Sequence, residues 1–357
     1  MRPPEFSRIL IVKLSALGDV AHALPVLDYL KKAAPRARID WAVDRRFSGL
    51  LEGNGALFRV LPLDLRRLKR EWTTGSARKE AAEAVRELRQ GRYDVAFDIQ
   101  GNAKSGVVTR LSGARLRFGF DRHGVREAPN LLFTNRKVAL RPEDQHITRK
   151  LLRVVSAPFG GDFDLSSLRA EIHTTEAQER RAAEVVQDAF PDSTPLLVVH
   201  PGTTWQTKRM DPGFWAEAVG ILKRRFRRMG VFISWGSEEE RREAEEIRQI
   251  AGPWVKPLPK LSLGDLAAVY RKCGFLMAPD TGPLHVAAAA GAKTVSVFRV
   301  TDGNRNAPYG TGHRFIQAPM PCTACLRKRC AQDAECRRSI APGAAADAMA
   351  GLIGRAG

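Results

Sequence analysis

The sequence predicts an α/β protein built from two doubly wound domains, and three observations support this. The chain has 357 residues, of which 44% are hydrophobic, and this is more than one typical domain requires. Short apolar segments alternate with helical patterns along most of its length. A stretch rich in glycine and aspartate, within residues 157–175, interrupts this alternation. We therefore expect a mostly parallel sheet on each side of the interruption.

The predicted strands fall into two sets, each made of short apolar runs bounded by turn residues. In the first half of the chain they occupy residues 8–14, 38–43, 59–63, 93–99 and 116–120. In the second half they occupy residues 195–202, 231–236, 254–258, 275–282 and 293–298. Helical patterns separate the members of each set, as in the βα units of a parallel sheet.

This alternation predicts how the domains are organised. We expect an N-terminal Rossmann-like domain over 1–165, a linker region over 166–194, a C-terminal Rossmann-like domain over 195–340 and a terminal helix over 341–357. Two such domains would face a central cleft, and ligands of these sheets bind beyond the carboxyl ends of the strands. Side chains in the strand-to-helix loops are therefore the first candidates for a functional site.

The charge of the chain favours a polyanionic partner. Its 58 lysines and arginines exceed its 39 acidic residues and give a net charge of +19, which suits nucleic acid, an anionic membrane surface or a phosphorylated substrate. No apolar run approaches the ~18 residues of a spanning helix, and the start MRPPEFSR lacks the apolar core of a signal peptide. We expect a cytoplasmic protein. The dispersed basic residues, without a recognised binding module, argue against nucleic acid.

Asp19 follows the first predicted strand, within the segment KLSALGDVAHALP. A carboxylate in this loop would face the ligand site and could accept a proton from an attacking hydroxyl group. Aspartate is also favoured at the start of a helix, where it caps free N–H groups. From the residues alone, a general base and a helix cap both remain open.

Thr203, Thr204 and Lys208 follow the strand that opens the second half. Their hydroxyl and ammonium groups could bind phosphate oxygens. A single lysine in a loop is more often simply solvated. These three residues therefore predict a phosphate site only in combination with other groups.

Asp280, Thr281 and Gly282 lie between an apolar strand and an apolar helix. Free N–H groups at the start of that helix could bind a diphosphate, and glycine permits the close approach of backbone and phosphate. The alternative is that Asp280 or Thr281 caps the helix while His285 packs on its first turn. The sequence contains neither the glycine-rich dinucleotide fingerprint nor the Walker A pattern.

Two charged runs are open to a functional and an ordinary interpretation. Glu238 begins the run EEERREAEE after a predicted strand, where an acidic residue could bind a ribose diol, but such a run is usually a solvated helix face. The run LRRLKREW could bind the phosphates of an anionic acceptor or form solvated surface. Its basic residues are Arg66, Arg67, Lys69 and Arg70.

Four of the five cysteines lie within fifteen residues, in the segment PCTACLRKRCAQDAEC. Cys322, Cys325, Cys330 and Cys336 equal zinc ligands in number, but their spacing is shorter than that of the usual zinc ribbons. A bound zinc ion, reduced thiols and a redox-sensitive disulfide are all open from the sequence. No D-x-D pair of the sequence is placed to hold a metal diphosphate.

Several ordered motifs together resemble glycosyltransferase family 9, and within it the heptosyltransferase I branch. The resemblance spans nearly the entire chain. It is carried by VKLSALGDVAHALP, YDVAFDIQGNAKSGVVTRL, TTWQTK, DTGPLH and TDGNRNAPYG. It implies a GT-B fold, in which the C-terminal domain holds the donor ADP-L-glycero-D-manno-heptose and the N-terminal domain holds the acceptor Kdo-lipid A.

The resemblance also implies roles for the candidate residues. Asp19 would be the general base, and Lys208 would stabilise the departing ADP in one inverting displacement without a metal or other cofactor. The implied donor-binding residues are Thr203, Thr204, Lys208, Glu238, Asp280, Thr281, Gly282 and His285. The implied acceptor-binding residues are Arg66, Arg67, Lys69, Arg70, Arg126 and His146.

Three other functions remain as alternatives. A heptosyltransferase II, or another family 9 enzyme with a different acceptor, would share the ADP-binding motifs. A non-catalytic protein that binds sugar nucleotides would keep these motifs without the base Asp19. A nucleic-acid-binding protein would use the positive charge. For a heptosyltransferase I we expect a peripheral position on the anionic inner face of the inner membrane, where the lipid acceptor resides.

Overall fold

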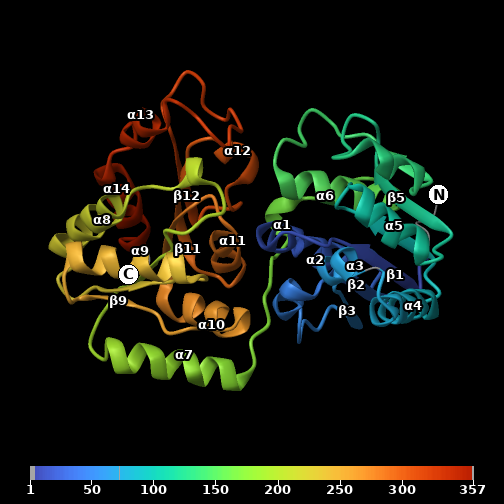
Figure 1. The fold of residues 1–357 in the computed structure, drawn as a ribbon, viewed down its shortest axis with the longest axis horizontal. Helices are drawn as coiled ribbons and strands as arrows, with labels where there is room; N and C mark the ends of the chain where they lie inside the picture. The colour runs from blue at the N-terminus through green and yellow to red at the C-terminus, as the bar shows by residue number, and fades with distance from the viewer. Residues whose placement is uncertain (1–4, 72, 356–357) are drawn as a thin grey trace. The chain divides into compact units, whose positions relative to one another are not determined.

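The computed structural model describes residues 5–71 and 73–355, without the side chains of Leu68 and Lys69. The chain divides into two compact units, Met1–His173 and Thr174–Gly357. Each unit holds one six-stranded parallel sheet with helices packed on it (Figure 1). The predicted α/β class is therefore confirmed, and the division falls inside the predicted linker region of 166–194.

The first unit is built on a sheet with the strand order β3-β2-β1-β4-β5-β6. Its strands are β1 (Arg8–Val12), β2 (Arg38–Asp44), β3 (Arg59–Leu63), β4 (Val95–Asp98), β5 (Leu116–Phe120) and β6 (Arg136–Val138). Its helices are α1 (Leu17–Ala23), α2 (Pro25–Ala33), α3 (Leu65–Glu71), α4 (Gly75–Gln90), α5 (Ala103–Leu111) and α6 (Ile147–Ser156). Short 3₁₀ segments complete it at η1 (Arg45–Leu50), η2 (Ala128–Leu132), η3 (Ala157–Phe159) and η4 (Leu165–Ser167).

The second unit repeats this arrangement with the strand order β12-β11-β10-β7-β8-β9. Its strands are β7 (Leu196–Val199), β8 (Gly230–Ile233), β9 (Val255–Pro257), β10 (Gly274–Pro279), β11 (Lys293–Phe298) and β12 (His313–Gln317). Its main helices are α7 (Glu176–Ala189), α8 (Pro212–Arg225), α9 (Glu238–Ala251), α10 (Leu263–Cys273), α11 (Gly282–Ala289) and α14 (Pro342–Ile353). Three short elements are η5 (Gln206–Lys208), α12 (Gly303–Asn306) and α13 (Asp333–Arg338).

Helices α7 and α14 both belong to the second unit. Helix α7, which fills much of the predicted linker region, packs against α10, and α14 packs against α8. All ten predicted strands are present, whereas β6 and β12 were not predicted. Two of the three residues of β6 are exposed, and β12 is partly exposed along its whole length, so neither of these two strands has a buried apolar run.

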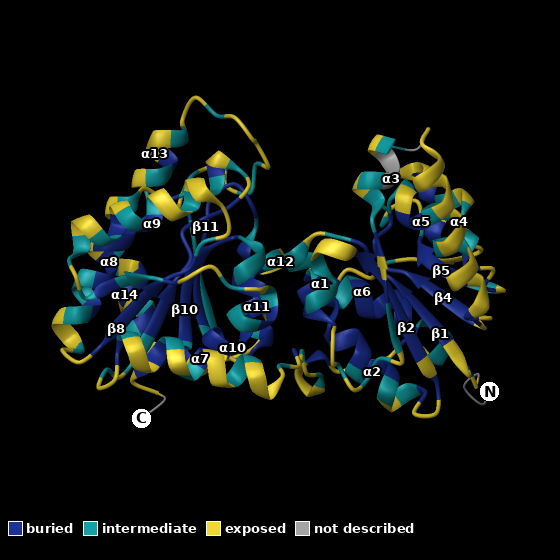
Figure 2. Cartoon of the chain, turned by 60° about the horizontal axis from the view of Figure 1, so that its bottom comes forward, coloured by how far each residue is buried: buried dark blue, intermediate teal, exposed yellow. Residues whose placement is uncertain are grey.

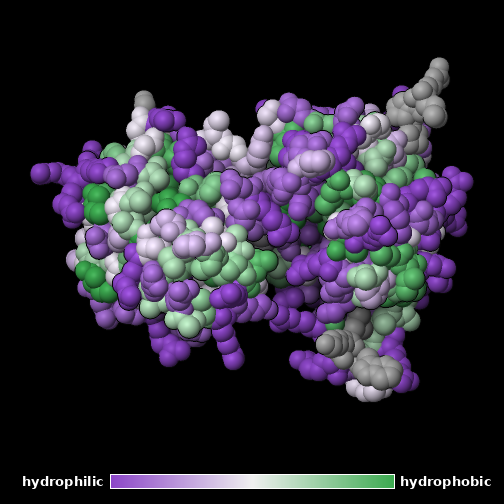
Figure 3. Space-filling model, turned by 90° about the horizontal axis from the view of Figure 1, so that it is seen from above, coloured by the Kyte–Doolittle hydropathy of each residue, from purple (hydrophilic) through white to green (hydrophobic). Residues whose placement is uncertain are grey.

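The core of each unit lies around its central strands, because strands covered by helices on both faces bury all their side chains. Ile9 to Val12 of β1 and Leu197 to Val199 of β7 are fully buried. Figure 2 shows this pattern as dark strands beneath helices with exposed outer faces. Hydrophilic side chains cover much of the face in Figure 3. No helix in the described part of the chain is long and apolar enough to cross a bilayer.

Strand order places a switch point in each sheet, and this is where such folds bind ligands. In the first sheet the order reverses between β1 and β4, which pair in parallel. In the second sheet it reverses between β7 and β10, which also pair in parallel. Asn102, Thr203 and Asp280 lie in the loops that follow β4, β7 and β10, and Asp19 lies in the first turn of α1, which follows β1.

Candidate functional site

The switch point of the second sheet brings together residues from the loops after β7 and β10. Lys208 Nζ lies 2.6 Å from Asp280 Oδ2, and the two residues are 72 positions apart in the chain. Thr301 Oγ1 donates a hydrogen bond to the same carboxylate oxygen at 2.7 Å. Thr203 Oγ1 donates to the backbone oxygen of Asp280 at 3.2 Å. The predicted donor residues Thr203, Lys208 and Asp280 therefore form one connected cluster.

Asp280 is a buried carboxylate that stays charged. His285 Nε2 lies 3.6 Å from its Oδ1 atom. Burial favours the neutral acid, but the hydrogen bond with His285 and the positive charge of Lys208 outweigh it and hold the pKa of Asp280 well below its usual range. The sequence alternative, in which Asp280 caps a helix, does not describe these contacts, because its carboxylate binds Lys208 and Thr301.

The start of α11 remains available to an anion. Thr281 is its N-cap residue, in an extended conformation, and makes no side-chain capping hydrogen bond. Gly282 is the first helical residue. Backbone N–H groups at such a start, together with the helix dipole, favour a negatively charged ligand. Next to this helix start, the ammonium group of Lys208 adds a positive charge, so the cluster has the composition of a diphosphate site.

The three glutamates after β8 have different partners. Glu238, which we predicted to bind the ribose, is largely exposed and pairs with Arg241 at 2.7 Å. Glu239 pairs with Arg209 at 2.6 Å. Glu240 accepts a hydrogen bond from the Gly236 N–H group at 2.6 Å. Glu240 also lies against Gly202, where an added Cβ atom would come within 2.3 Å of its Oε1 atom. Glu239 and Glu240 therefore both lie beside the segment between β7 and α8, next to Arg209 and Gly202 respectively.

The exposure and contacts of Thr204 differ from those of its neighbours. It is exposed, whereas Thr203 is buried against Asp280. Beside it, the Trp205 ring lies under the ammonium group of Lys208, with Nζ 5.0 Å from the ring centroid. This cation–π contact holds the lysine from one side while Asp280 holds it from another. The position of the Lys208 ammonium is therefore fixed before any ligand arrives.

In the first unit, Asp19 is the third residue of α1 rather than its N-cap residue. Its Oδ2 atom accepts a hydrogen bond from the Ala16 N–H group at 3.2 Å and lies 4.0 Å from Arg126 NH1. The side chain keeps about a third of its surface exposed. It therefore helps to start the helix and still presents carboxylate surface to a ligand, so the two interpretations of Asp19 are compatible.

Two charged residues near Asp19 were missed from the sequence. Lys13 is buried at the end of β1, and its Nζ atom donates to the Ile99 backbone oxygen at 3.3 Å. Burial lowers the pKa of Lys13, although the negative charges of Asp19 and Asp98 oppose this. Asp98 is buried at the end of β4, and burial raises its pKa. The sequence feature that could have identified both residues is a charged side chain at the end of an apolar strand.

The predicted acceptor residues lie in three different settings. Arg66 and Arg70 line a cavity of about 470 Å³. The other lining residues are Leu14, Ser15, Asp44, Arg46, Leu65, Asn102 and Lys104. Arg67 instead pairs with Glu71 and Glu80, and Arg70 also pairs with Glu71. The side chain of Lys69 lies outside the described residues. Arg46 and Lys104, which we had not predicted, thus join two of the four predicted cations.

Arg126 and His146 lie outside that cavity lining. Arg126 is the exposed arginine opposite Asp19. His146 is the buried N-cap residue of α6, and its Nδ1 atom accepts a hydrogen bond from the Thr148 N–H group at 3.2 Å. Its ring packs edge to face on His22 with the centroids 5.7 Å apart. His146 therefore has a clear role in starting a helix, beside its predicted role in acceptor binding.

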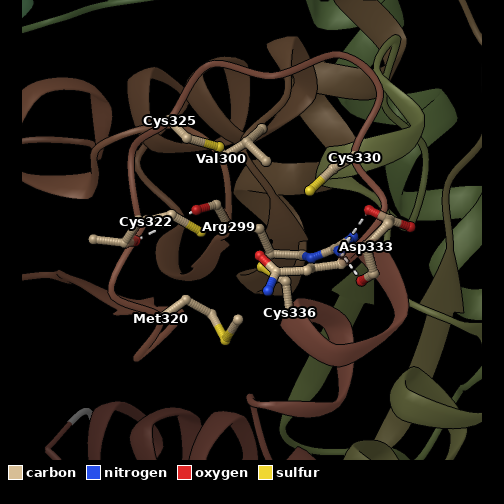
Figure 4. Close-up of a pocket in the computed structure, with 10 residues that line it drawn as sticks. Arg299, Val300, Met320, Cys322, Cys325, Cys330, Asp333 and Cys336 are labelled. Carbon is tan, nitrogen blue, oxygen red and sulfur yellow. Dashed lines mark hydrogen bonds and ion pairs between the residues drawn. The ribbon is translucent and has the colours of Figure 1, made fainter.

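The four clustered cysteines surround one small pocket of the second unit (Figure 4). All of them are free thiols. Over residues 5–71 and 73–355, no three side chains of the His, Cys, Asp and Glu types are arranged to hold a metal ion. The zinc hypothesis for Cys322, Cys325, Cys330 and Cys336 therefore rests on their spacing alone.

The buried Asp280 carboxylate gives a pH-dependent prediction. Replacement of Asp280 by Asn is expected to lower the free energy of unfolding near pH 7 by about 3 kcal/mol, because Lys208 loses its buried partner. A depressed pKa stabilises the fold above the ordinary carboxyl value of about 4, and this stability is lost as the pH falls through the folded pKa. The difference between the two proteins should therefore shrink below about pH 4.

Urea unfolding of the native protein and of Asp280→Asn between neutral and acid pH measures this difference. Asp347→Asn is a suitable control, since the Asp347 side chain is mostly exposed in its pair with Arg225. We expect this control to change the free energy of unfolding by less than about 0.5 kcal/mol. A difference for Asp280→Asn that stays constant down to acid pH would contradict the assigned charge state.

Comparisons with known proteins agree with this architecture. Residues 82–335 match the family model described as glycosyltransferase family 9 (heptosyltransferase). Lipopolysaccharide heptosyltransferase 1 of Pseudomonas aeruginosa is 32% identical over 330 residues, which cover 90% of this chain and 87% of that protein. The same-named protein of Escherichia coli K12 is 29% identical over 87% of this chain and 94% of its own length.

Solved structures give the same result. E. coli heptosyltransferase WaaC with ADP-2-deoxy-2-fluoro heptose superposes with a TM-score of 0.73 at 28% identity, over 89% of this chain and 96% of that one. A family 9 glycosyl transferase from Veillonella parvula has a TM-score of 0.81 at 19% identity, over 99% of both chains, and supports the fold. The fold is thus that of the GT-B heptosyltransferase, and this chain belongs to glycosyltransferase family 9, the heptosyltransferases.

Proposed function

We propose that this glycosyltransferase moves L-glycero-D-manno-heptose from ADP-heptose to a Kdo sugar of Kdo-lipid A, in the synthesis of the lipopolysaccharide inner core. The observation that carries this proposal is the cluster of Lys208, Asp280 and Thr203 at the start of α11. Relatives support it as well, because WaaC is described with ADP and with an ADP-heptose analogue. Several relatives bear the name lipopolysaccharide heptosyltransferase 1.

On the donor side, the diphosphate of ADP-heptose would bind the free N–H groups in the first turn of α11, among them that of Gly282, and the Lys208 ammonium. As the bond from the anomeric carbon to the β-phosphate breaks, negative charge grows on the departing ADP. Fixed positive groups at that position lower the barrier most. Since these groups supply the positive charge that a divalent ion gives other transferases, we infer that transfer requires no metal ion.

For the ribose, Glu240 is a better candidate than Glu238. Its carboxylate is adjacent to Gly202, in the loop that follows β7, whereas Glu238 pairs with Arg241 on the surface of α9. Acidic residues in comparable loops of nucleotide-binding folds accept hydrogen bonds from ribose hydroxyls. We therefore assign the ribose contact to Glu240 and keep Glu238 as the alternative.

On the acceptor side, we assign the cavity with Arg46, Arg66, Arg70 and Lys104 to the anionic groups of Kdo-lipid A. Arginine binds carboxylate and phosphate groups through paired N–H donors, which suits both the Kdo acids and the lipid A phosphates. Asp19 would remove the proton from the Kdo hydroxyl group as that oxygen attacks the anomeric carbon. One displacement of this kind inverts the configuration at that carbon.

A transfer assay with purified protein tests this function. Mass spectrometry should detect one heptose added to Kdo-lipid A from ADP-heptose, with the rate unchanged by a chelator of divalent ions. An acceptor that already carries the first heptose should react at least tenfold more slowly. Faster reaction of that second acceptor would instead favour a heptosyltransferase II, and no transfer to either would contradict the proposal.

We also propose that the protein docks on the anionic inner face of the membrane that holds its lipid acceptor. The net charge of +19 supports this, since each basic residue near such a surface contributes about 1 kcal/mol. In the same assay, the acceptor can be presented in vesicles of anionic lipid. Sedimentation of the protein with these vesicles should fall as salt is added, because salt screens the attraction. Binding that is insensitive to salt would contradict this localisation.

A further inference from the structure

The ring of Trp205, in the loop after β7, contacts a second lysine, Lys328, which has no role in the proposed function. The ammonium group of Lys328 lies 5.0 Å from the centroid of the Trp205 ring. The ammonium group of Lys208 lies at the same distance from that ring. The two positive groups are therefore no further apart than the sum of these distances, and one of them belongs to the proposed diphosphate site.

The loop that brings Lys328 to this ring is fixed by specific contacts. We call residues 320–332, which connect β12 to α13, the cysteine loop. Thr207 Oγ1 donates to the backbone oxygen of Arg327 at 2.8 Å and so joins the donor loop to the cysteine loop. The Leu326 N–H group donates to the Val300 backbone oxygen at 2.8 Å. The residues before Lys328 are thus anchored to Thr207 and Val300, the chain neighbours of Lys208 and Thr301.

The backbone of the cysteine loop is also unusual. Ala324 and Leu326 have φ angles of 58° and 57°, in the left-handed region that residues with a side chain seldom adopt. Such conformations persist where surrounding contacts determine them, and they are frequent at ligand sites. Between these two residues, Cys325 turns toward the small pocket that the cysteine side chains share (Figure 4). Contacts with the surrounding residues therefore hold the cysteine loop in one specific backbone conformation.

The charge near Lys328 is not balanced. The ammonium group of Lys208 is paired with the carboxylate of Asp280 at 2.6 Å. Lys328 is exposed, and no carboxylate of the described residues comes within 4.0 Å of its ammonium group. Arg327 and Arg329 on either side of it are exposed as well. Like charges around one ring repel each other, and an anion bound between them removes this repulsion. The two cations at the Trp205 ring therefore favour an anionic ligand beside them.

We propose that Lys328 is a second cationic residue of the donor site and contacts a phosphate group of a nucleoside diphosphate bound beside Lys208. This inference rests on the proposed function, since it requires the diphosphate to bind at the start of α11. Trp205 orients both ammonium groups through its ring. The cysteine loop thereby becomes a wall of the donor site.

Calorimetric titration with ADP and with AMP, which lacks the β-phosphate, tests this role. In Lys328→Met, the dissociation constant for ADP should rise by about three- to tenfold, the scale of one charge-assisted contact in a partly exposed site. The constant for AMP should change less than about twofold, because fewer phosphate oxygens are present. Lys328→Arg keeps the charge and should restore most of the affinity for ADP.

Lys272→Met is the matched control, since Lys272 is an exposed lysine in the last turn of α10, before β10 begins. It should leave both dissociation constants unchanged, and all variants should unfold at the same temperature as the native protein. A native protein that binds ADP no tighter than AMP would overturn the proposed donor site itself. An unchanged preference for ADP in Lys328→Met would overturn the role of Lys328 alone.

Discussion

Replacement of Asp19 by Asn is expected to slow heptose transfer by about 10²- to 10⁴-fold, the contribution of a general base. Binding of ADP-heptose should change less than about twofold, because Asp19 belongs to the first unit and the donor cluster to the second. The amide oxygen of Asn can still accept the hydrogen bond from the Ala16 N–H group, so α1 should keep its start. The loss should therefore appear in kcat and leave the fold intact.

Asp28→Asn gives a matched control for this experiment. Asp28 lies in the first turn of α2, is exposed to nearly the same extent as Asp19 and pairs with Lys32 at 3.0 Å. It should keep normal turnover. Steady-state rates with ADP-heptose and Kdo-lipid A, together with thermal unfolding of both variants, complete the comparison. Near-normal turnover in Asp19→Asn would remove the assigned base, whereas a loss of fold in that variant would point to its capping contact.

Replacement of Lys208 by Met is expected to weaken ADP binding by about 10- to 100-fold and to lower kcat as well, since this ammonium group meets phosphate charge in the ground state and in the transition state. The same change leaves the buried Asp280 carboxylate without its ion-pair partner. Loss of one partner of a buried pair costs about 3 to 5 kcal/mol of stability. A drop in activity could therefore come from the site or from the fold.

The double variant Lys208→Met with Asp280→Asn separates these two causes. It removes the unpaired carboxylate, so we expect it to recover much of the lost stability while ADP binding stays weak. Lys223→Met is the control, because Lys223 also lies over a tryptophan, with Nζ 5.3 Å from the Trp254 ring centroid, on a helix away from the cluster. If the double variant regained both stability and ADP affinity, Lys208 would be a structural residue only.

For the cysteine loop, the sequence revealed only the number and spacing of the cysteines. The count of four cysteines suggested zinc, redox chemistry or simple thiols, and nothing in it indicated a link to the donor loop. That link runs through Thr207 and Arg327, and through the contact of Lys328 with Trp205. Each joins residues more than a hundred positions apart, so no local pattern could predict it.

The acceptor region illustrates the same point for charges. The run LRRLKREW identified a basic segment, but Arg67 is neutralised by Glu71 and Glu80, and Glu80 belongs to the next helix, α4. Arg46 and Lys104, which line the cavity with Arg66, come from η1 and α5, which follow two other strands. The sequence gives the number of basic residues. How many of them remain unpaired and can attract a ligand depends on which carboxylates the fold places beside them.

The amino-acid sequence by itself determined the α/β class, ten of the twelve described strands and the segments after these strands in which Asp19, Lys208 and Asp280 lie. It did so because strands covered on both faces must be continuous apolar runs, and turn residues bound such runs. Tertiary structure alone decided the pairing of Lys208 with Asp280, the separate partners of the three glutamates and the edge strands β6 and β12. These features depend on the order in which distant strands pair, and this order leaves no periodic pattern in the chain.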